Sequence, residues 1–151
     1  MAPHLRHAVA ADLPAILALW RAVAVPSVTD TEGALRALLE HDPGALVVAE
    51  EPAAPGQPGQ VVGTVVAGWD GWRGSVYRLA VAPSHRRRGL GVRLVRAAIE
   101  HLTRRGARRV QAFVVGDDEH AVAFWEATGW TYERGQRRYT RSVAPATPEG
   151  G

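Results

Sequence analysis

The feature that most constrains the fold is a short apolar segment followed at once by a glycine-containing loop and an amphipathic helix. Residues 75–82 are apolar and rich in β-forming types, which predicts a buried central strand that Pro83 ends. Residues 90–105 carry apolar side chains at helical spacing, and Gly106 follows as a C-terminal cap. The chain must therefore pass from a buried strand to a helix N-terminus through one short loop.

The loop between this strand and this helix has the composition of an anion-binding site. The first turn of a helix presents unpaired backbone N–H groups and the positive end of the helix dipole. Gly89 and Gly91 allow an anion to approach the main chain closely, and the arginines at 86–88 add positive charge. The loop lacks the lysine and Ser/Thr of a nucleotide P-loop and the third glycine of a dinucleotide fingerprint. ATP and NAD are therefore poor fits.

The rest of the chain alternates between β-like and helical segments. A mixed sheet with helices on both faces, and so an α/β class, accounts for that alternation. The remaining predicted strands are residues 4–9, 45–50, 61–69 and 108–115, with a hairpin at 130–141. Three further helices are predicted. The first begins at Asp12, which would cap it, and the other two span about 31–40 and 118–128.

Composition limits the domain count and the chemistry. A chain of 151 residues, 46% of them hydrophobic, suffices for one core, so we expect one domain at 1–142 and a disordered tail at 143–151. Cysteine is absent, which excludes disulfides, thiolate metal sites and a cysteine acyl-enzyme. The six histidines are scattered, so no metal site is expected. No run approaches membrane-spanning length, and a cytoplasmic protein without membrane contact is the default expectation.

Arginine supplies all of the basic side chains beyond histidine, because the sequence contains no lysine. Two arginine-rich segments, 104–109 and 134–141, fall at an element end and on the predicted hairpin, where charge is ordinarily solvated. Nucleic-acid binding through these segments is the less favoured interpretation.

The strand, loop and helix resemble those of the GCN5-related N-acetyltransferases, whose signature is Arg/Gln-x-x-Gly-x-Gly/Ala between a strand and a helix. Arg86, Gly89 and Gly91 match every position, and residues 79–83 match the family's approach strand. A second family element, a helix ending in an aromatic pair and Gly-aromatic, is similar to residues 121–130. The resemblance runs from Leu5 to about Arg141, and it implies a mostly antiparallel sheet of about six to seven strands.

The resemblance implies a co-substrate, acetyl-CoA, and assigns residues to it. The pantetheine arm would pair with the strand edge at Leu79, Ala80 and Val81. The Val81 N–H would polarise the thioester carbonyl in an oxyanion-hole role. The pyrophosphate would lie on the backbone amides of the loop, formed by Arg86, Arg87, Arg88, Gly89, Leu90 and Gly91.

The sequence departs from the family at positions linked to proton transfer. Many relatives carry a tyrosine, acting as general acid, where this chain has Trp125, whose indole cannot protonate a thiolate. Asp118 stands where the family often has asparagine, as a helix cap or a cofactor contact. Phe113 stands where relatives that acetylate protein N-termini often have glutamate. The candidates for the base that deprotonates the amine are Tyr77, Asp70, Asp117, Glu119 and His120.

The expected reaction is direct acetyl transfer to a primary amine, on a small molecule or a peptide, in a ternary complex. Candidates for an acceptor pocket are Trp69, Asp70, Trp72 and Trp130. The tryptophans could equally pack in the core or form a homodimer contact. Two alternatives stay open: a non-catalytic acyl-CoA-binding module, and an acetyltransferase acting on an RNA-linked amine.

Overall fold

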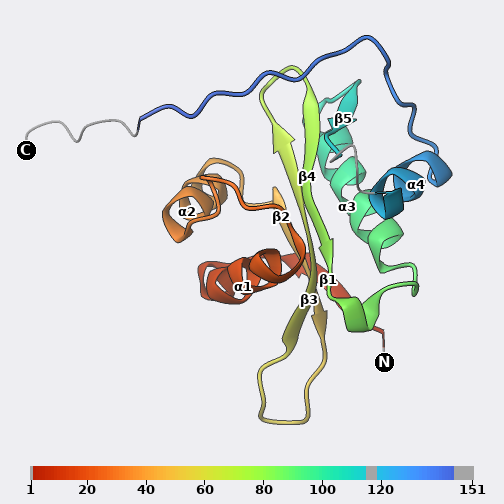
Figure 1. Ribbon diagram of the computed structural model, residues 1–151. Coiled ribbons are helices and arrows are strands. Elements are labelled where there is room, and N and C mark those ends of the chain that lie inside the picture. Colours follow the sequence, from red (N-terminus) through yellow and green to blue (C-terminus); the bar gives the residue numbers. More distant parts are fainter. Residues whose placement is uncertain (1, 115–118, 145–151) are drawn as a thin grey trace, which may run out of the picture. The chain divides into compact units, whose positions relative to one another are not determined.

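A computed structural model describes residues 2–114 and 119–144 (Figure 1). The chain divides into two compact units, Met1–Val114 and Val115–Gly151. The single domain expected at 1–142 stays a prediction, and the expected tail lies outside the described residues from position 145 onward. No helix among the described residues is long and apolar enough to cross a membrane.

The first unit is built on one sheet whose strands follow the order of the chain. The described strands are β1 (His4–His7), β2 (Leu46–Glu51), β3 (Gln60–Trp69), β4 (Gly74–Val81) and β5 (Val110–Ala112). Neighbours pair antiparallel from β1 to β4, and β5 pairs parallel to β4. The parallel pair requires a crossover, which a helix between β4 and β5 provides.

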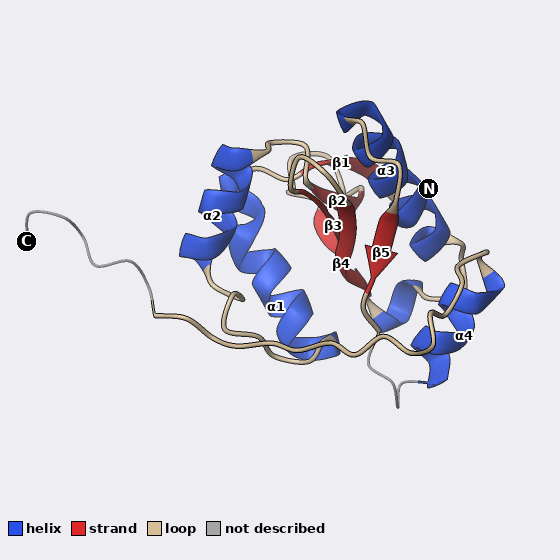
Figure 2. Cartoon of the chain, turned by 90° about the horizontal axis from the view of Figure 1, so that it is seen from above, coloured by secondary structure: helices blue, strands red, loops and turns tan. Residues whose placement is uncertain are grey.

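Helices cover both faces of this sheet (Figure 2). On one face lie α1 (Leu13–Val23), preceded by the 3-10 turn η1 (Ala10–Asp12), and α2 (Glu32–His41). On the other face lies α3 (Leu90–Arg105), which follows the 3-10 turn η2 (Pro83–His85). A cluster of buried apolar side chains joins α1 and α2 to the sheet and is formed by Ala8, Leu13, Ile16, Leu17, Trp20, Leu35, Leu46, Val48, Val66 and Ala80. The predicted α/β class with a mixed, mostly antiparallel sheet is confirmed.

The sheet has fewer strands than the six to seven expected, because the predicted hairpin at 130–141 is not formed. The described residues there turn at Gly135, whose φ is 86°, but they form no strand. Every side chain from 131 to 144 is exposed, so no packing against the described residues holds a hairpin together there. The second unit contains α4 (Glu119–Ala127), which ends close to the predicted position, before Gly129.

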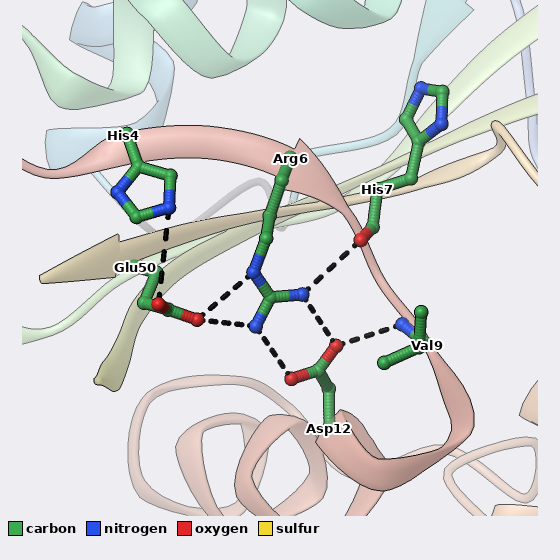
Figure 3. Close-up of polar contacts among 6 residues, drawn as sticks. All are labelled: His4, Arg6, His7, Val9, Asp12 and Glu50. Carbon is green, nitrogen blue, oxygen red and sulfur yellow. Dashed lines mark hydrogen bonds and ion pairs between the residues drawn. The ribbon is translucent and has the colours of Figure 1, made fainter. Parts of the chain in front are cut away.

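The start of α1 shows a salt-bridge network that the sequence did not suggest (Figure 3). Asp12 precedes the helix as predicted, but its carboxylate makes no capping hydrogen bond to the helix. It accepts two bonds of 2.8 Å from the Arg6 guanidinium and one from the Val9 N–H. The same guanidinium also donates to Glu50 of β2. Arg6 therefore ties the edge strand to its neighbour and to the first helix.

This network makes the stability of the fold sensitive to acid. The Arg6 hydrogen bonds, aided by the Val9 N–H, hold the pKa of Asp12 below its ordinary value despite partial burial. A lowered folded-state pKa stabilises the protein above the unfolded value of about 3.9, and this contribution is lost as pH falls below it. We expect Asp12→Asn to destabilise by about 1–3 kcal/mol at pH 7. The gap from wild type should shrink below pH ~4.

Urea unfolding at several pH values measures both expectations. Glu32→Gln is the control, because Glu32 is half-exposed and lies 3.9 Å from Arg36 within α2. Exposed pairs of this kind contribute about 0.3–0.5 kcal/mol, so its effect should be small at every pH. If the difference in free energy of unfolding between wild type and Asp12→Asn stays constant from pH 7 to pH 3, the ionised Asp12 carboxylate is not the source of the stabilisation.

A second buried network joins the ends of α2 and α3. Asp42 accepts hydrogen bonds of 2.8 Å from His101 Nε2 and from the Arg105 guanidinium. Burial alone would raise the pKa of Asp42, but the bonds from His101 and Arg105 outweigh burial and lower it. The position of α3 along the sheet is thus fixed at its C-terminal end, away from the glycine loop that precedes it.

Candidate functional site

Within the described part of the first unit, one edge of β4 has no strand partner over its C-terminal half and is here called the open edge. The parallel partner β5 pairs only with residues 74–76, so among the described residues no strand continues beside β4 from Tyr77 to Val81. The Ala82 N–H donates to Val62 O on the β3 side. Because successive backbone amides alternate in direction, the Val81 N–H is directed to the opposite, open side.

The three residues proposed for the pantetheine arm differ in orientation. Ala80 pairs with Thr64 of β3, and its side chain is buried in the core beside α1. Leu79 and Val81, on either side of it, are half-buried. An extended ligand could therefore form main-chain hydrogen bonds with every second residue along this edge of β4, and Val81 is the last of these residues.

The open edge leads directly into the glycine loop. Arg86, Arg87 and Arg88 are all exposed, and Arg86 Nε donates to Val81 O at 3.3 Å. Gly89 immediately precedes α3 with a φ of 75°, the left-handed region that glycine adopts without steric cost. A Cβ built on Gly89 would meet no atom within 4 Å, so the space in front of the helix is open.

The first residues of α3 fix the direction of the helix N-terminus. Leu90 is buried, whereas Gly91 is only half-buried and leaves the main chain approachable. The amides of the first helical turn have no partners within the helix, and no side chain caps them at Gly89. This geometry can bind an anion, as expected from the sequence.

His85 attaches the start of the glycine loop to β2, a role that the sequence did not suggest. The imidazole is buried. Its Nε2 lies 2.9 Å from Glu51 of β2, and its Nδ1 lies 2.7 Å from Ser84 Oγ. The glycine loop is therefore fastened to a neighbouring strand. No local pattern signals this contact, because Glu51 and His85 are far apart in sequence.

The candidate bases are placed differently. Tyr77 lies on the face that α1 and α2 cover, at the open edge of β4, and it is 43% exposed. Its ring lies against Gly68, where a Cβ would come within 2.9 Å of Tyr77 Cε2. Asp70 is occupied in a turn: its carboxylate accepts the backbone N–H groups of Arg73 and Trp72, which lower its pKa. A carboxylate so stabilised is a poor base, which leaves Tyr77 the better candidate of the two.

The remaining predicted site residues belong to the second unit or lie outside the description. Asp117 and Asp118 are not among the described residues, whereas Glu119 and His120 are exposed in the first turn of α4. The Trp125 ring makes edge-to-face contacts with Phe124 and Trp130, at centroid distances of 5.3 and 4.7 Å. These contacts give Trp125 a packing role within its own unit.

The other residues considered from sequence show no organised site. Trp72 is exposed and stacks under the Arg73 guanidinium at 4.2 Å, and Phe113 is exposed as well. Within the described ranges, no group of three or more His, Asp or Glu side chains could hold a metal ion.

Comparisons with known proteins agree with this fold. The family model described as the acetyltransferase (GNAT) family matches residues 13–130. Acetyltransferase SG1711 of Sodalis glossinidius is 32% identical over 116 residues, which cover 76% of this chain and 78% of the relative. Acetyltransferase ECA0875 of Pectobacterium atrosepticum is 33% identical over 116 residues, which again cover 76% of this chain and 78% of the relative. The chain belongs to the GNAT family of acetyltransferases.

Among solved structures, the fold is similar to the NatC complex bound to Gag peptide and CoA. The TM-score is 0.74 at 20% identity, covering 85% of this chain and 84% of that one. It is also similar to AAC(6')-Iy in complex with a bisubstrate analogue, with a TM-score of 0.71 at 18% identity, covering 95% of this chain and all of that one. At these identities the likeness establishes the fold alone.

Proposed function

We propose that this protein transfers an acetyl group from acetyl-CoA to a primary amine while both substrates are bound. The observation that carries the proposal is the continuity of three features in one place. The open edge of β4 runs into the exposed arginines at 86–88, then into Gly89 and the N-terminus of α3. An extended ligand with amides at one end and phosphates at the other matches that sequence of features.

Coenzyme A has this chemistry, and the residues fit it. The backbone amides from Gly89 to Gly91, beside Arg86, Arg87 and Arg88, would bind the pyrophosphate in the space that a Cβ on Gly89 would partly fill. The main-chain groups at Leu79 and Val81 would pair with the pantetheine amides as a strand edge does, with Val81 O exchanging its 3.3 Å bond from Arg86 Nε for one from the ligand. Acetyl-CoA supplies the activated acetyl group as a thioester.

Backbone geometry supplies most of the proposed catalysis. The Val81 N–H would donate to the thioester carbonyl oxygen, where negative charge develops as the amine attacks. A C–N bond forms as the C–S bond breaks, and the amine loses the proton that balances the one the thiolate gains. We assign Tyr77, half-exposed on the same edge, to relay the amine proton to water. The thiolate would take its proton from water, because Trp125 cannot supply one.

The acceptor class in the proposal is a small molecule or a peptide. NatC was solved with a peptide and AAC(6')-Iy with a bisubstrate analogue of acetylneamine, and both share this fold. A cytoplasmic location and a soluble amine acceptor, rather than nucleic acid, complete the proposal. A homodimer is compatible with it and is tested by the mass of the protein in solution.

Measuring release of free CoA thiol tests the function. The purified protein is incubated with acetyl-CoA and a panel of primary amines, including polyamines, aminoglycosides, amino acids and short peptides. We expect amine-dependent release above the hydrolysis background. Saturable binding of acetyl-CoA with no turnover on any amine would instead favour a non-catalytic binding module. Salt-dependent retention of RNA would favour the RNA-linked acceptor.

A further inference from the structure

Arg78 occupies a strained position in β4, close to the proposed thioester site. Tyr77 pairs with Val66 and Ala80 pairs with Thr64, so Arg78 and Leu79 together face one residue of β3 and form a bulge. The φ of Arg78 is 51°, in the left-handed region that non-glycine residues rarely occupy. Such a backbone persists only where its surroundings hold it.

The backbone of the bulge is held by buried side chains. The Thr64 hydroxyl donates to Arg78 O at 2.9 Å, and Thr64 Oγ1 accepts the Trp20 indole N–H at 2.8 Å. Thr64 is fully buried and Trp20 nearly so. This chain of hydrogen bonds joins α1, β3 and the bulge, and it satisfies the carbonyl that the bulge removes from the strand ladder.

The Arg78 side chain is held as firmly as its backbone. Its guanidinium donates to both carboxylate oxygens of Asp30, at 2.6 and 2.7 Å, and to Val25 O at 2.8 Å. It also lies 5.3 Å from the centre of the Trp20 ring. Both members of the ion pair are less than one-fifth exposed. The segment that links α1 to α2 is therefore fastened to the bulge.

We infer that Arg78 is a positioning residue, which acts through its ion pair with Asp30 to hold the Leu79–Val81 edge in the orientation that receives the pantetheine arm. The bulge lies three residues before Val81, at the point where β4 loses its pairing with β5. A bulge rotates the strand that follows it, so its geometry fixes the direction of the Val81 N–H. This inference rests on the proposed function, because it assumes that the edge binds coenzyme A.

Two binding probes separate this role from a general loss of structure. Coenzyme A uses both the strand edge and the glycine loop, whereas 3′-phosphoadenosine 5′-diphosphate carries the pyrophosphate without the pantetheine arm. In Asp30→Ala, we expect calorimetric affinity for coenzyme A to fall about tenfold, as the loss of a charged hydrogen-bonded pair predicts. Affinity for 3′-phosphoadenosine 5′-diphosphate should be unchanged, because the glycine loop keeps its own anchor at His85.

Arg78→Gly is the second variant, because glycine accepts the positive φ and only the anchoring side chain is lost. It should reproduce the Asp30→Ala pattern even if its stability differs. Arg78→Lys keeps the charge without the planar fork and should restore part of the coenzyme A affinity. The matched control is Glu32→Ala, which removes a more exposed carboxylate two residues along the chain and should leave both affinities unchanged.

The outcomes are distinct. Selective loss of coenzyme A affinity in Asp30→Ala and Arg78→Gly supports the inference. Equal loss for both probes, or no loss for either, overturns it and leaves the proposed function standing. Absence of coenzyme A binding by the wild type refutes the proposed function itself.

Discussion

Gly89→Glu should abolish measurable binding of coenzyme A while leaving the fold intact. The substitution places a carboxylate in the open space before α3, where the proposed pyrophosphate lies against backbone N–H groups. Repulsion between like charges at contact distance is about 4 kcal/mol at a protein surface, so an affinity loss of about a thousandfold is expected. Calorimetric titration with coenzyme A measures the loss.

Glycine replacement also strains the backbone, so the controls must carry the same strain. The φ of Gly89 is 75°, which costs a non-glycine residue about 1–2 kcal/mol. Gly56 offers a match in the β2–β3 loop, with a φ of 83° and no atom within 4 Å of a built Cβ. Gly56→Glu should lower stability similarly and leave binding unchanged. Gly89→Ala carries the strain and a small Cβ but no charge, so it should lose less affinity than Gly89→Glu. Wild-type affinity in Gly89→Glu would refute the phosphate site.

Elements set by local chemistry were predictable from the sequence. The spacing of apolar residues and the glycines at both ends predicted a helix at 90–105, and α3 has these bounds. Its C-terminal cap, Gly106, has a φ of 104°, as a left-handed cap requires. The glycine loop before it was likewise visible, because the backbone amides of a helix N-terminus need no distant partner.

Features that depend on contacts distant in sequence were not predictable. His85 has a buried partner in Glu51, and Arg78 has one in Asp30, yet no periodicity links either pair. The bulge at Arg78 was missed for the same reason, since only the pairing of β3 with β4 defines it. The hairpin expected at 130–141 shows the converse: local turn residues were present, but the side chains from 131 onward stay exposed, so no packing fixes a hairpin.

The structure reduces the number of candidates for the base that deprotonates the amine. Sequence left five candidate bases of similar merit. Asp70 is committed to backbone N–H groups in a turn, whereas Tyr77 lies half-exposed at the open edge of β4. The proposed chemistry therefore depends more on the main chain of β4 than on any strongly polarised side chain.

Val81→Pro tests this dependence most directly, because proline lacks the N–H assigned to the thioester carbonyl. We expect the rate of acetyl transfer to fall by about 10²–10³, the usual effect of removing one oxyanion-hole donor. The Val81 N–H is directed away from β3, so proline removes no hydrogen bond from the sheet. The preceding residue, Ala80, is already extended, as proline requires of its neighbour.

The amine that gives the fastest thiol release with the wild type serves as the acceptor in this test. Val81→Ala is the control, because it shortens the same side chain and keeps the N–H, so its rate should stay near that of the wild type. Thermal unfolding and retained binding of 3′-phosphoadenosine 5′-diphosphate establish that Val81→Pro is folded. If the folded proline variant transfers acetyl groups at the wild-type rate, the main chain of β4 does not stabilise the transition state. Catalysis would then have to come from side chains, with Tyr77 the first to replace.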